Sequence, residues 1–156
     1  MGSEMCIRDS ILNKAPRHQV IMQTDFSHID FKPFPGVAGL DVCVFDVDLE
    51  RQIIDAVFRF PANETVALHR HVSQTNMLIL SGELMIYDDD GSVRDRRTAG
   101  HYFTGTQDDV HIEGGGPDGA VVFYSVRGHG NPSIIELLDN DHNVIGSLSF
   151  EDAAKL

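Results

Sequence analysis

The sequence predicts an all-β protein, and three observations lead to this fold class. About nine short segments rich in Val, Ile and Phe carry interleaved polar residues, as half-buried strands do. Gly, Pro, Asn and Asp separate these segments, which is typical of the turns in a sandwich or barrel. Only residues 150–156, FEDAAKL, read as helical, and that segment is short. We therefore expect a β-sandwich or β-barrel with a short C-terminal helix.

The candidate strands follow one another along the chain and are separated by recognisable turns. Asp88–Gly91 (DDDG) is a hairpin signal, because Asp-Gly tolerates the positive φ of a tight turn. Ser81-Gly82 divides two apolar runs, and a turn of Asp, Asn and His residues divides the last two strands. The expected strands are weakly alternating HQVIMQ (18–23), GLDVCVFDVDLE (39–50), RQIIDAVFRF (51–60), TVALHRH (65–71), NMLIL (76–80), ELMIY (83–87), AVVFYSV (120–126) and the two halves of SIIELLDNDHNVIGSLSF (133–150). RDRR (94–97) is expected to be an exposed strand face.

The chain length of 156 residues fits one domain, and we divide it into three parts. Residues 1–10 are excluded from the fold, because MGS is typical of an expression start and EMCIRDS resembles read-through of a sequencing adapter. Residues 11–40 are expected to form an N-terminal arm with strands. Residues 41–156 are expected to form the barrel, beyond the Pro- and Gly-rich stretch at 31–39.

Composition excludes several classes of function. The net charge of −12 argues against nucleic acid and anionic membranes as partners, since both are bound through Lys and Arg. No window approaches the roughly 20 unbroken apolar residues of a membrane helix. No secretory signal pattern precedes the fold, so we expect a cytoplasmic protein. The two cysteines, Cys6 and Cys43, provide no disulfide framework.

His69 and His71 are the first candidate metal ligands. Side chains at i and i+2 of a strand point to the same face, so both imidazoles project together and Arg70 points away. Two such rings lie about 6–7 Å apart along the strand, from a rise of roughly 3.3 Å per residue, and can converge on one cation. Alone, an HxH pair is weak evidence, because surface histidines are common. A third histidine, His111, lies forty residues beyond His71.

Residues 61–111 resemble the two motifs of the cupin superfamily. The first motif is Gly, five residues, HxH, three or four residues, Glu, six residues, Gly. Here Asn63 stands for the first Gly, Thr75 for Glu, and Gly82 closes the motif. The second motif is Gly, five residues, Pro-x-Gly, two residues, His, and here it runs from Gly100 through Thr106-Gln107-Asp108 to His111. The resemblance implies a single cupin domain, a jelly-roll-like β-barrel, that binds metal through His69, His71 and His111.

Because the glutamate of the first motif is missing at Thr75, the chain resembles a smaller group of cupins more closely. Neither Thr75 nor Asn76 supplies a carboxylate, and some cupins hold their metal with three histidines only. The chain resembles the acetylacetone-cleaving and hydroxyacetophenone-type dioxygenases over Phe58–Ala153. Where the diketone-cleaving relatives carry a glutamate, an arginine and two pocket aromatics, this chain has Gly105, Tyr87, Val122 and Val126. The resemblance therefore supports the metal site more strongly than it supports any particular substrate.

The ligand set and this resemblance together predict a chemistry. Three protein ligands leave open metal positions, as catalytic sites do, and neutral imidazoles leave the full +2 charge on the ion. Such a site favours an anionic chelating substrate such as the enolate of a diketone or hydroxyketone. We expect Fe(II), with Zn, Ni or Mn as alternatives. We expect a dioxygenase that takes dioxygen and a small carbonyl compound and cleaves a carbon–carbon bond.

Five further residues are candidates around this site. Gln74, Thr75 and Asn76 follow the HxH pair, and we expect them to accept hydrogen bonds from the second ring nitrogens of the ligating histidines. Tyr87 and Tyr102 are the catalytic candidates, as donors to the substrate. The alternative for both tyrosines is a position in the core with a satisfied hydroxyl.

Two other classes of function remain open. One is a non-catalytic metal-binding or sensor cupin, such as the zinc-bound regulatory domains attached to anti-sigma factors. The other is a different enzyme, either a Zn or Ni isomerase or a three-histidine thiol dioxygenase. For the last, we find neither the Ser-His-Tyr support nor a cysteine near the metal. Cupins pair through sheet edges or exchanged N-terminal strands, and residues 17–48 could pair in this way. We therefore expect the protein to form a homodimer or homotetramer.

Overall fold

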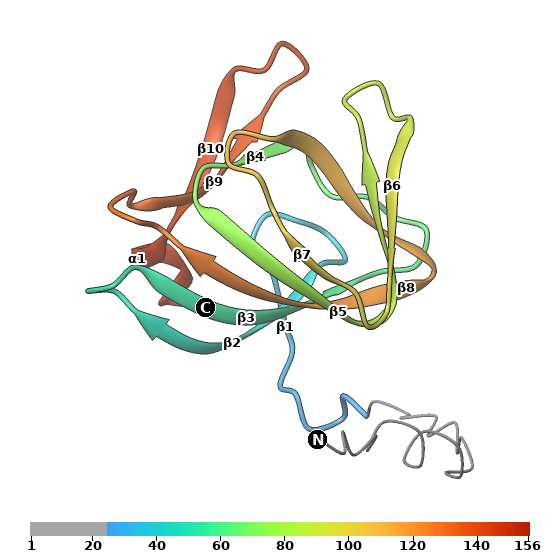
Figure 1. Cartoon of the computed structure of the whole chain (residues 1–156), viewed down its shortest axis with the longest axis horizontal. Helices are drawn as coiled ribbons and strands as arrows, with labels where there is room; N and C mark the ends of the chain where they lie inside the picture. Colours follow the sequence, from blue (N-terminus) through green and yellow to red (C-terminus); the bar gives the residue numbers. More distant parts are fainter. Residues whose placement is uncertain (1–24) are drawn as a thin grey trace, which may run out of the picture.

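The computed structural model describes residues 25–156. The expected adapter-derived segment, Cys6 and the weakly alternating stretch 18–23 lie outside these residues. Residues 25–156 form ten strands and one helix (Figure 1). They are β1 (Lys32–Pro33), β2 (Asp41–Asp48), β3 (Ile53–Phe60), β4 (His69–His71), β5 (Gln74–Tyr87), β6 (Val93–Thr98), β7 (Tyr102–Thr104), β8 (Val110–Arg127), β9 (Ser133–Leu138), β10 (Val144–Ser149) and α1 (Phe150–Ala153).

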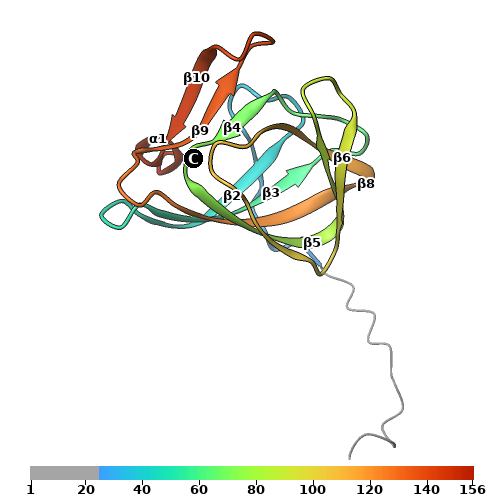
Figure 2. The ribbon, with the colours of Figure 1, turned by 45° about the horizontal axis from the view of Figure 1, so that its top comes forward.

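The strands form one curled sheet that closes part of the way into a barrel (Figure 2). The neighbours along it are β1-β2-β3-β8-β4-β9-β10, while β5 pairs with β6, β7 and β8. All pairings between the named strands are antiparallel. The expected all-β barrel with a short C-terminal helix is therefore confirmed. In the described part of the chain no helix is long and apolar enough to cross a membrane.

β8 is the strand that joins the two ends of the barrel. Its first part, residues 110–115, pairs with β4 on one edge and with the end of β5 on the other. Its second part, residues 120–127, pairs with β3 and with the beginning of β5. From the sequence we predicted a strand only over residues 120–126, because the stretch Gly114-Gly115-Gly116-Pro117 is typical of a loop. The strand in fact begins ten residues earlier, at Val110.

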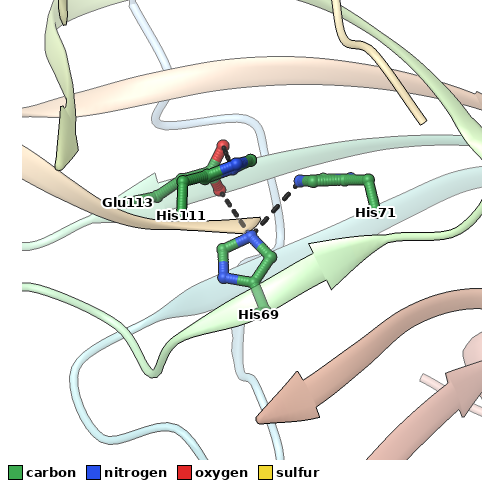
Figure 3. A group of neighbouring side chains, drawn as sticks. All are labelled: His69, His71, His111 and Glu113. Atoms are coloured by element: carbon green, nitrogen blue, oxygen red, sulfur yellow. Dashed lines mark hydrogen bonds and ion pairs between the residues drawn. The ribbon is translucent and has the colours of Figure 1, made fainter. Parts of the chain in front are cut away.

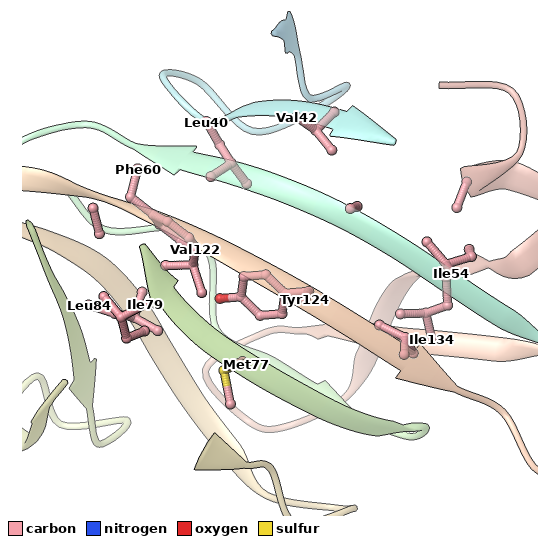
Figure 4. Packing of buried hydrophobic residues seen from close by; sticks show 14 of the residues in the cluster. Leu40, Val42, Ile54, Phe60, Met77, Ile79, Leu84, Val122, Tyr124 and Ile134 are labelled. Atoms are coloured by element: carbon pink, nitrogen blue, oxygen red, sulfur yellow. The ribbon is translucent and has the colours of Figure 1, made fainter. Parts of the chain in front are cut away.

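The apolar face of the sheet forms the core. Ile79 of β5 and Phe58 of β3 both pair with Val122 of β8, so their side chains lie on the same face. Val122 and Ile79 are almost fully buried (Figure 4). Complete burial of such a side chain contributes about 1.5–3 kcal/mol. The helix α1 closes one end of this core with Phe150 and Ala153, and it begins with a capping box between Ser149 and Asp152.

Two residues outside the strands keep the backbone shape that the cupin motifs need. Asn63 and Asp108 stand where the motifs have glycine, and both have positive φ, 56° and 63°. Asn and Asp are the non-glycine residues that enter this region most readily. The two sequence departures therefore preserve the turns that lead into β4 and β8.

Gly82 is the position where β5 can tolerate no side chain. Its φ is +70°, and a Cβ at this position would lie 2.0 Å from the carbonyl oxygen of Gly119 in β8. The register between β5 and β8 shifts at this point, since Gly82 pairs with Ala120 and Leu84 pairs with Gly115. The two strands thus bend together where their backbones touch.

We predict that Gly82→Ala destabilises the protein much more than Gly91→Ala. Both glycines have positive φ, but an added Cβ at Gly91 meets nothing within 4 Å. Gly91→Ala should therefore cost only the roughly 1–2 kcal/mol of the left-handed conformation. Gly82→Ala should cost roughly 1–3 kcal/mol more from overpacking. Urea denaturation of both variants measures the difference, and equal losses would show that the close approach of β5 and β8 is not needed.

Candidate metal centre

Three histidines and one glutamate converge inside the barrel (Figure 3). His69 in β4 lies directly opposite His111 in β8 in the antiparallel ladder. His71 and Glu113 each lie two residues further along these strands, so all four side chains share one face. One ligand atom from each lies within 4.8 Å of the others. We call His69, His71, His111 and Glu113 the metal group.

The distances within the metal group fit the edges of a coordination shell. His69 Nε2 lies 3.2 Å from His71 Nε2 and 3.7 Å from Glu113 Oε2. His111 Nε2 lies 3.6 Å from Glu113 Oε1. Ligands about 2.0–2.1 Å from a tetrahedral ion are separated by about 3.3 Å. The three Nε2 atoms and the Glu113 carboxylate are thus spaced as ligands of one small cation would be.

Hydrogen bonds orient each imidazole with Nε2 toward this centre. His69 Nδ1 lies 2.9 Å from the carbonyl oxygen of Ala67, and His111 Nδ1 lies 3.0 Å from Asp109 Oδ2. A carbonyl and a carboxylate only accept, so each Nδ1 carries the hydrogen and donates it. The lone pair of each neutral ring then lies on Nε2, which is the ligating atom.

Thr75 plays the same part for His71. Its Oγ1 donates to the carbonyl oxygen of Ser73 at 3.2 Å and lies 3.0 Å from His71 Nδ1. A hydroxyl has a single hydrogen, so Oγ1 must accept from His71. The residue that replaces the glutamate of the cupin motif therefore orients a histidine.

The metal group is buried and has polar atoms without partners. His69, His71, His111 and Glu113 are each 4–6% exposed. Within residues 25–156, His111 Nε2 and Glu113 Oε1 have no hydrogen-bond partner. Buried polar atoms are almost always satisfied, and a bound cation would satisfy both of these. The donor set, three imidazoles and a carboxylate, suits Zn, Fe, Ni or Mn.

Burial and the neighbouring charges shift the pKa values of the metal group. Burial lowers the pKa of His71 to about 3 and lowers that of His69 as well. Burial also lowers the pKa of His111, but the carboxylates of Glu113 and Asp109 outweigh it and raise the net value. For Glu113, burial raises the pKa, and the three histidines outweigh this and lower it. Glu113 is thus ionised at neutral pH.

Glu113 was not among the sequence-predicted site residues. The sequence led us to expect three histidines with no carboxylate, and a full +2 charge on the metal. The structure instead brings in a carboxylate from β8, and the charge of a bound divalent ion falls toward +1 if Glu113 coordinates it. The signal was present in the sequence, since Glu113 follows His111 by two residues. It was hidden because the adjacent glycines read as a loop.

The remaining candidates lie in different surroundings. Gln74 and Asn76 alternate with Thr75 on β5 and point to the other face, where Gln74 Oε1 lies 3.1 Å from His129 Nε2. Tyr87 pairs with Ile112, so it shares the face opposite to His111 and Glu113. Tyr102 is 62% exposed. The structure thus brings none of these four side chains to the metal group.

Tyr124 is the tyrosine that reaches the metal group. It is buried, and its hydroxyl donates to Glu113 Oε2 at 3.1 Å. Burial and the Glu113 carboxylate raise the pKa of this hydroxyl, which stays protonated and acts as a donor. In the sequence, Tyr124 lies within the apolar run 120–126, which gave no sign of a role at the metal group. Only the pairing of Tyr124 with Met77, in register with the inner face of β5, reveals its direction.

A cavity of about 90 Å³ lies beside the metal group, in the barrel interior. His69, His71, Thr75, Glu113 and Tyr124 contribute its polar side chains. The rest of the wall is aliphatic or aromatic and comes from β2, β3, β8, β9, β10, the N-terminal segment and the C-terminal end; it includes Phe34, Val42, Ala56, Phe58, Val126, Ile134, Leu148, Ala153 and Leu156. The centre therefore faces an apolar compartment.

We predict that Thr75→Val weakens metal binding by about 10- to 100-fold, the usual effect of losing the partner of a ligating imidazole. The substitution conserves shape but removes the acceptor of the His71 Nδ1 hydrogen. Gln74→Ala, one residue away on the other face, is the matched control and should leave the affinity unchanged. Competition with a chromophoric chelator measures both. Equal effects of the two variants would refute the role of Thr75.

The metal-free protein should lose stability as the pH falls below about 6.5. The folded state resists protonation of His71 down to a pKa of about 3, whereas the unfolded chain binds that proton near 6.5. The free energy of unfolding therefore falls with pH across this window. In His71→Gln the urea midpoint should depend less steeply on pH than in the unaltered protein. A parallel slope for His71→Gln would contradict the assignment.

The chain is similar in fold to several proteins of known structure. Solved structures show the same fold in a candidate acetylacetone dioxygenase from Methylibium petroleiphilum PM1, with a TM-score of 0.69 and 21% identity over 85% of this chain and 90% of that one. An acetylacetone dioxygenase from Acinetobacter johnsonii gives a TM-score of 0.69 and 18% identity over 85% and 87%. The complex of SigE with the anti-sigma ChrR from Rhodobacter sphaeroides gives 0.53 and 16% over 65% and 51%.

These identities establish a shared fold and nothing finer. Comparison with curated protein sequences gave no match. The family model described as the ChrR cupin-like domain matches residues 19–130, which is most of the chain. This match agrees with the curled sheet and with the position of the metal group, and the chain therefore belongs to the ChrR cupin-like family.

Proposed function

We propose that this protein is a metal-dependent dioxygenase that cleaves a carbon–carbon bond in a small, apolar diketone or hydroxyketone. The observation that carries the proposal is the position of the metal group, whose imidazoles His69 and His71 form part of the wall of an apolar cavity. The fold shared with two proteins described as acetylacetone dioxygenases supports it. The reaction consumes one dioxygen per substrate, and both oxygen atoms end in the two fragments.

The donor set suits Fe(II) for this chemistry. A bound Fe(II) would supply Lewis acidity toward the oxygens of an enolate and redox chemistry with dioxygen. His69, His71 and His111 would hold the ion through Nε2, and their Nδ1 partners fix the ring planes before any ligand arrives. This preorganisation means that little rearrangement is needed when substrate binds.

The apolar wall of the cavity selects the rest of the substrate. Ala56, Phe58 and Val126 offer no hydrogen-bonding side chain, so an additional charged or polar group would lose its hydration without compensation. Alkyl and aryl substituents have no hydrogen bonds with water to lose, and they gain van der Waals contact with the apolar wall. Exclusion of water would also strengthen the attraction between an enolate and the bound ion.

Glu113 determines how open the site is. Its Oε2 accepts the hydrogen bond of Tyr124, while Oε1 is buried without a partner. If neither oxygen of Glu113 binds the metal, three protein ligands leave room for a chelating substrate. If Oε1 binds the metal, four protein ligands can complete a tetrahedral site, which is typical of structural zinc. This second arrangement favours a non-catalytic metal-binding module, an alternative supported by the family match and by the fold shared with the anti-sigma ChrR.

Metal loading followed by oxygen uptake tests the proposal. Protein stripped with a chelator and reloaded anaerobically with Fe(II) should consume oxygen in a one-to-one ratio with a β-diketone or hydroxyaryl ketone. The same protein loaded with Zn(II) should consume none, which controls for reaction in solution. An Fe(II)-loaded protein that consumes no oxygen with any member of the substrate panel would refute the dioxygenase.

The Glu113→Gln variant separates the two alternatives. In the dioxygenase, where neither oxygen of Glu113 coordinates the ion, this variant should weaken Zn(II) binding only modestly. In the four-ligand module, loss of the carboxylate should weaken Zn(II) binding strongly. Tyr124→Phe is the companion variant, since it removes the hydrogen bond to Oε2 without removing the carboxylate.

A further inference from the structure

Arg94, on the edge strand β6, contacts three groups at once. Its Nε donates to Asp88 Oδ1 at 2.6 Å, and its Nη1 donates to both oxygens of Asp109, at 2.8 and 3.1 Å. Its Nη2 donates to the carbonyl oxygen of Val110 at 2.9 Å. Only the planar, five-donor guanidinium can make this set of contacts from one side chain.

Two of these three contacts lead to the same metal ligand. Asp109 Oδ2 lies 3.0 Å from His111 Nδ1 and accepts its hydrogen. Val110 immediately precedes His111, so the carbonyl held by Arg94 belongs to the peptide bond that enters it. Arg94 therefore constrains both the side-chain partner and the backbone of His111.

The segment that carries Asp109 has few other attachments. β6 pairs only with β5, and β8 begins at Val110, so residues 105–109 form the connection after β7. The backbone N–H of Asp108 donates to the carbonyl oxygen of His71 at 2.8 Å. Arg94 holds Asp109, the next residue of the same turn, through both of its carboxylate oxygens.

We propose that Arg94 is a positioning residue of the metal group, acting through Asp109 on His111. Without Arg94, Asp109 can rotate toward solvent, because its side chain is 36% exposed. The His111 ring then loses the acceptor that fixes its orientation. Since exposed ion pairs contribute little to global stability, the main effect should appear in metal affinity and not in folding.

The proposal predicts a graded series in Zn(II) affinity. Arg94→Met should weaken Zn(II) binding by about 10-fold, the lower end of the effect of losing an imidazole's direct partner. Arg94→Lys should recover part of the loss, because an ammonium can reach Asp109 but cannot also hold Asp88 and Val110. Arg96→Met is the matched control. It removes the same charge from the same strand, where Arg96 Nη1 lies 4.0 Å from Glu83 Oε2.

A double-mutant cycle separates positioning from a general structural effect. In an Asp109→Ala background, Arg94→Met should cause a much smaller further loss of Zn(II) affinity, since only its contact with the Val110 carbonyl then remains. Fully additive losses, or equal affinities for Arg94→Met and Arg96→Met, would overturn the proposal. So would the absence of zinc binding by the unaltered protein. All of these measurements use zinc, so they are independent of whether the dioxygenase proposal holds.

Discussion

The site depends on one repeated interaction: each histidine of the metal group donates its Nδ1 hydrogen to a fixed oxygen. The three acceptors are the carbonyl of Ala67, the hydroxyl of Thr75 and the carboxylate of Asp109. Each donation leaves a lone pair on Nε2, and the β4–β8 ladder brings the three lone pairs together. Without a cation, two nitrogen lone pairs 3.2 Å apart would repel. The arrangement is therefore one that a metal ion stabilises.

The barrel is built so that this pairing can occur. His69 and His111 meet only because β8 continues from the metal group, past a Gly-rich stretch, into the core. Gly82 lets β5 follow the same bend, and Asn63 and Asp108 hold the left-handed turns before β4 and β8. The fold and the metal group thus rest on the same few backbone positions. Changes to these positions would disturb the core and the metal group together.

Parts of this arrangement were predictable from sequence because they depend on local periodicity and spacing. The alternation of side chains placed His69 and His71 on one face, and the cupin spacing added His111. Glu113 was not predictable in the same way, since the strand that carries it passes through glycines and a proline. We predicted Tyr87 and Tyr102, and not Tyr124, as the tyrosines of the site. The register shifts in β5 and the pairing partners of each strand decide which tyrosine faces the metal group, and neither can be predicted from the neighbouring sequence.

The departures from the cupin motif change which residues surround the metal group. Thr75 occupies the position of the motif's glutamate and orients His71, while a carboxylate arrives from Glu113 on another strand. Anomalous diffraction from crystals of the Zn(II)-loaded protein tests this convergence most directly. We expect a single peak about 2.0–2.1 Å from Nε2 of His69, His71 and His111. A peak elsewhere, or one of these three rings turned away from it, would contradict the convergence of the three histidines on one ion.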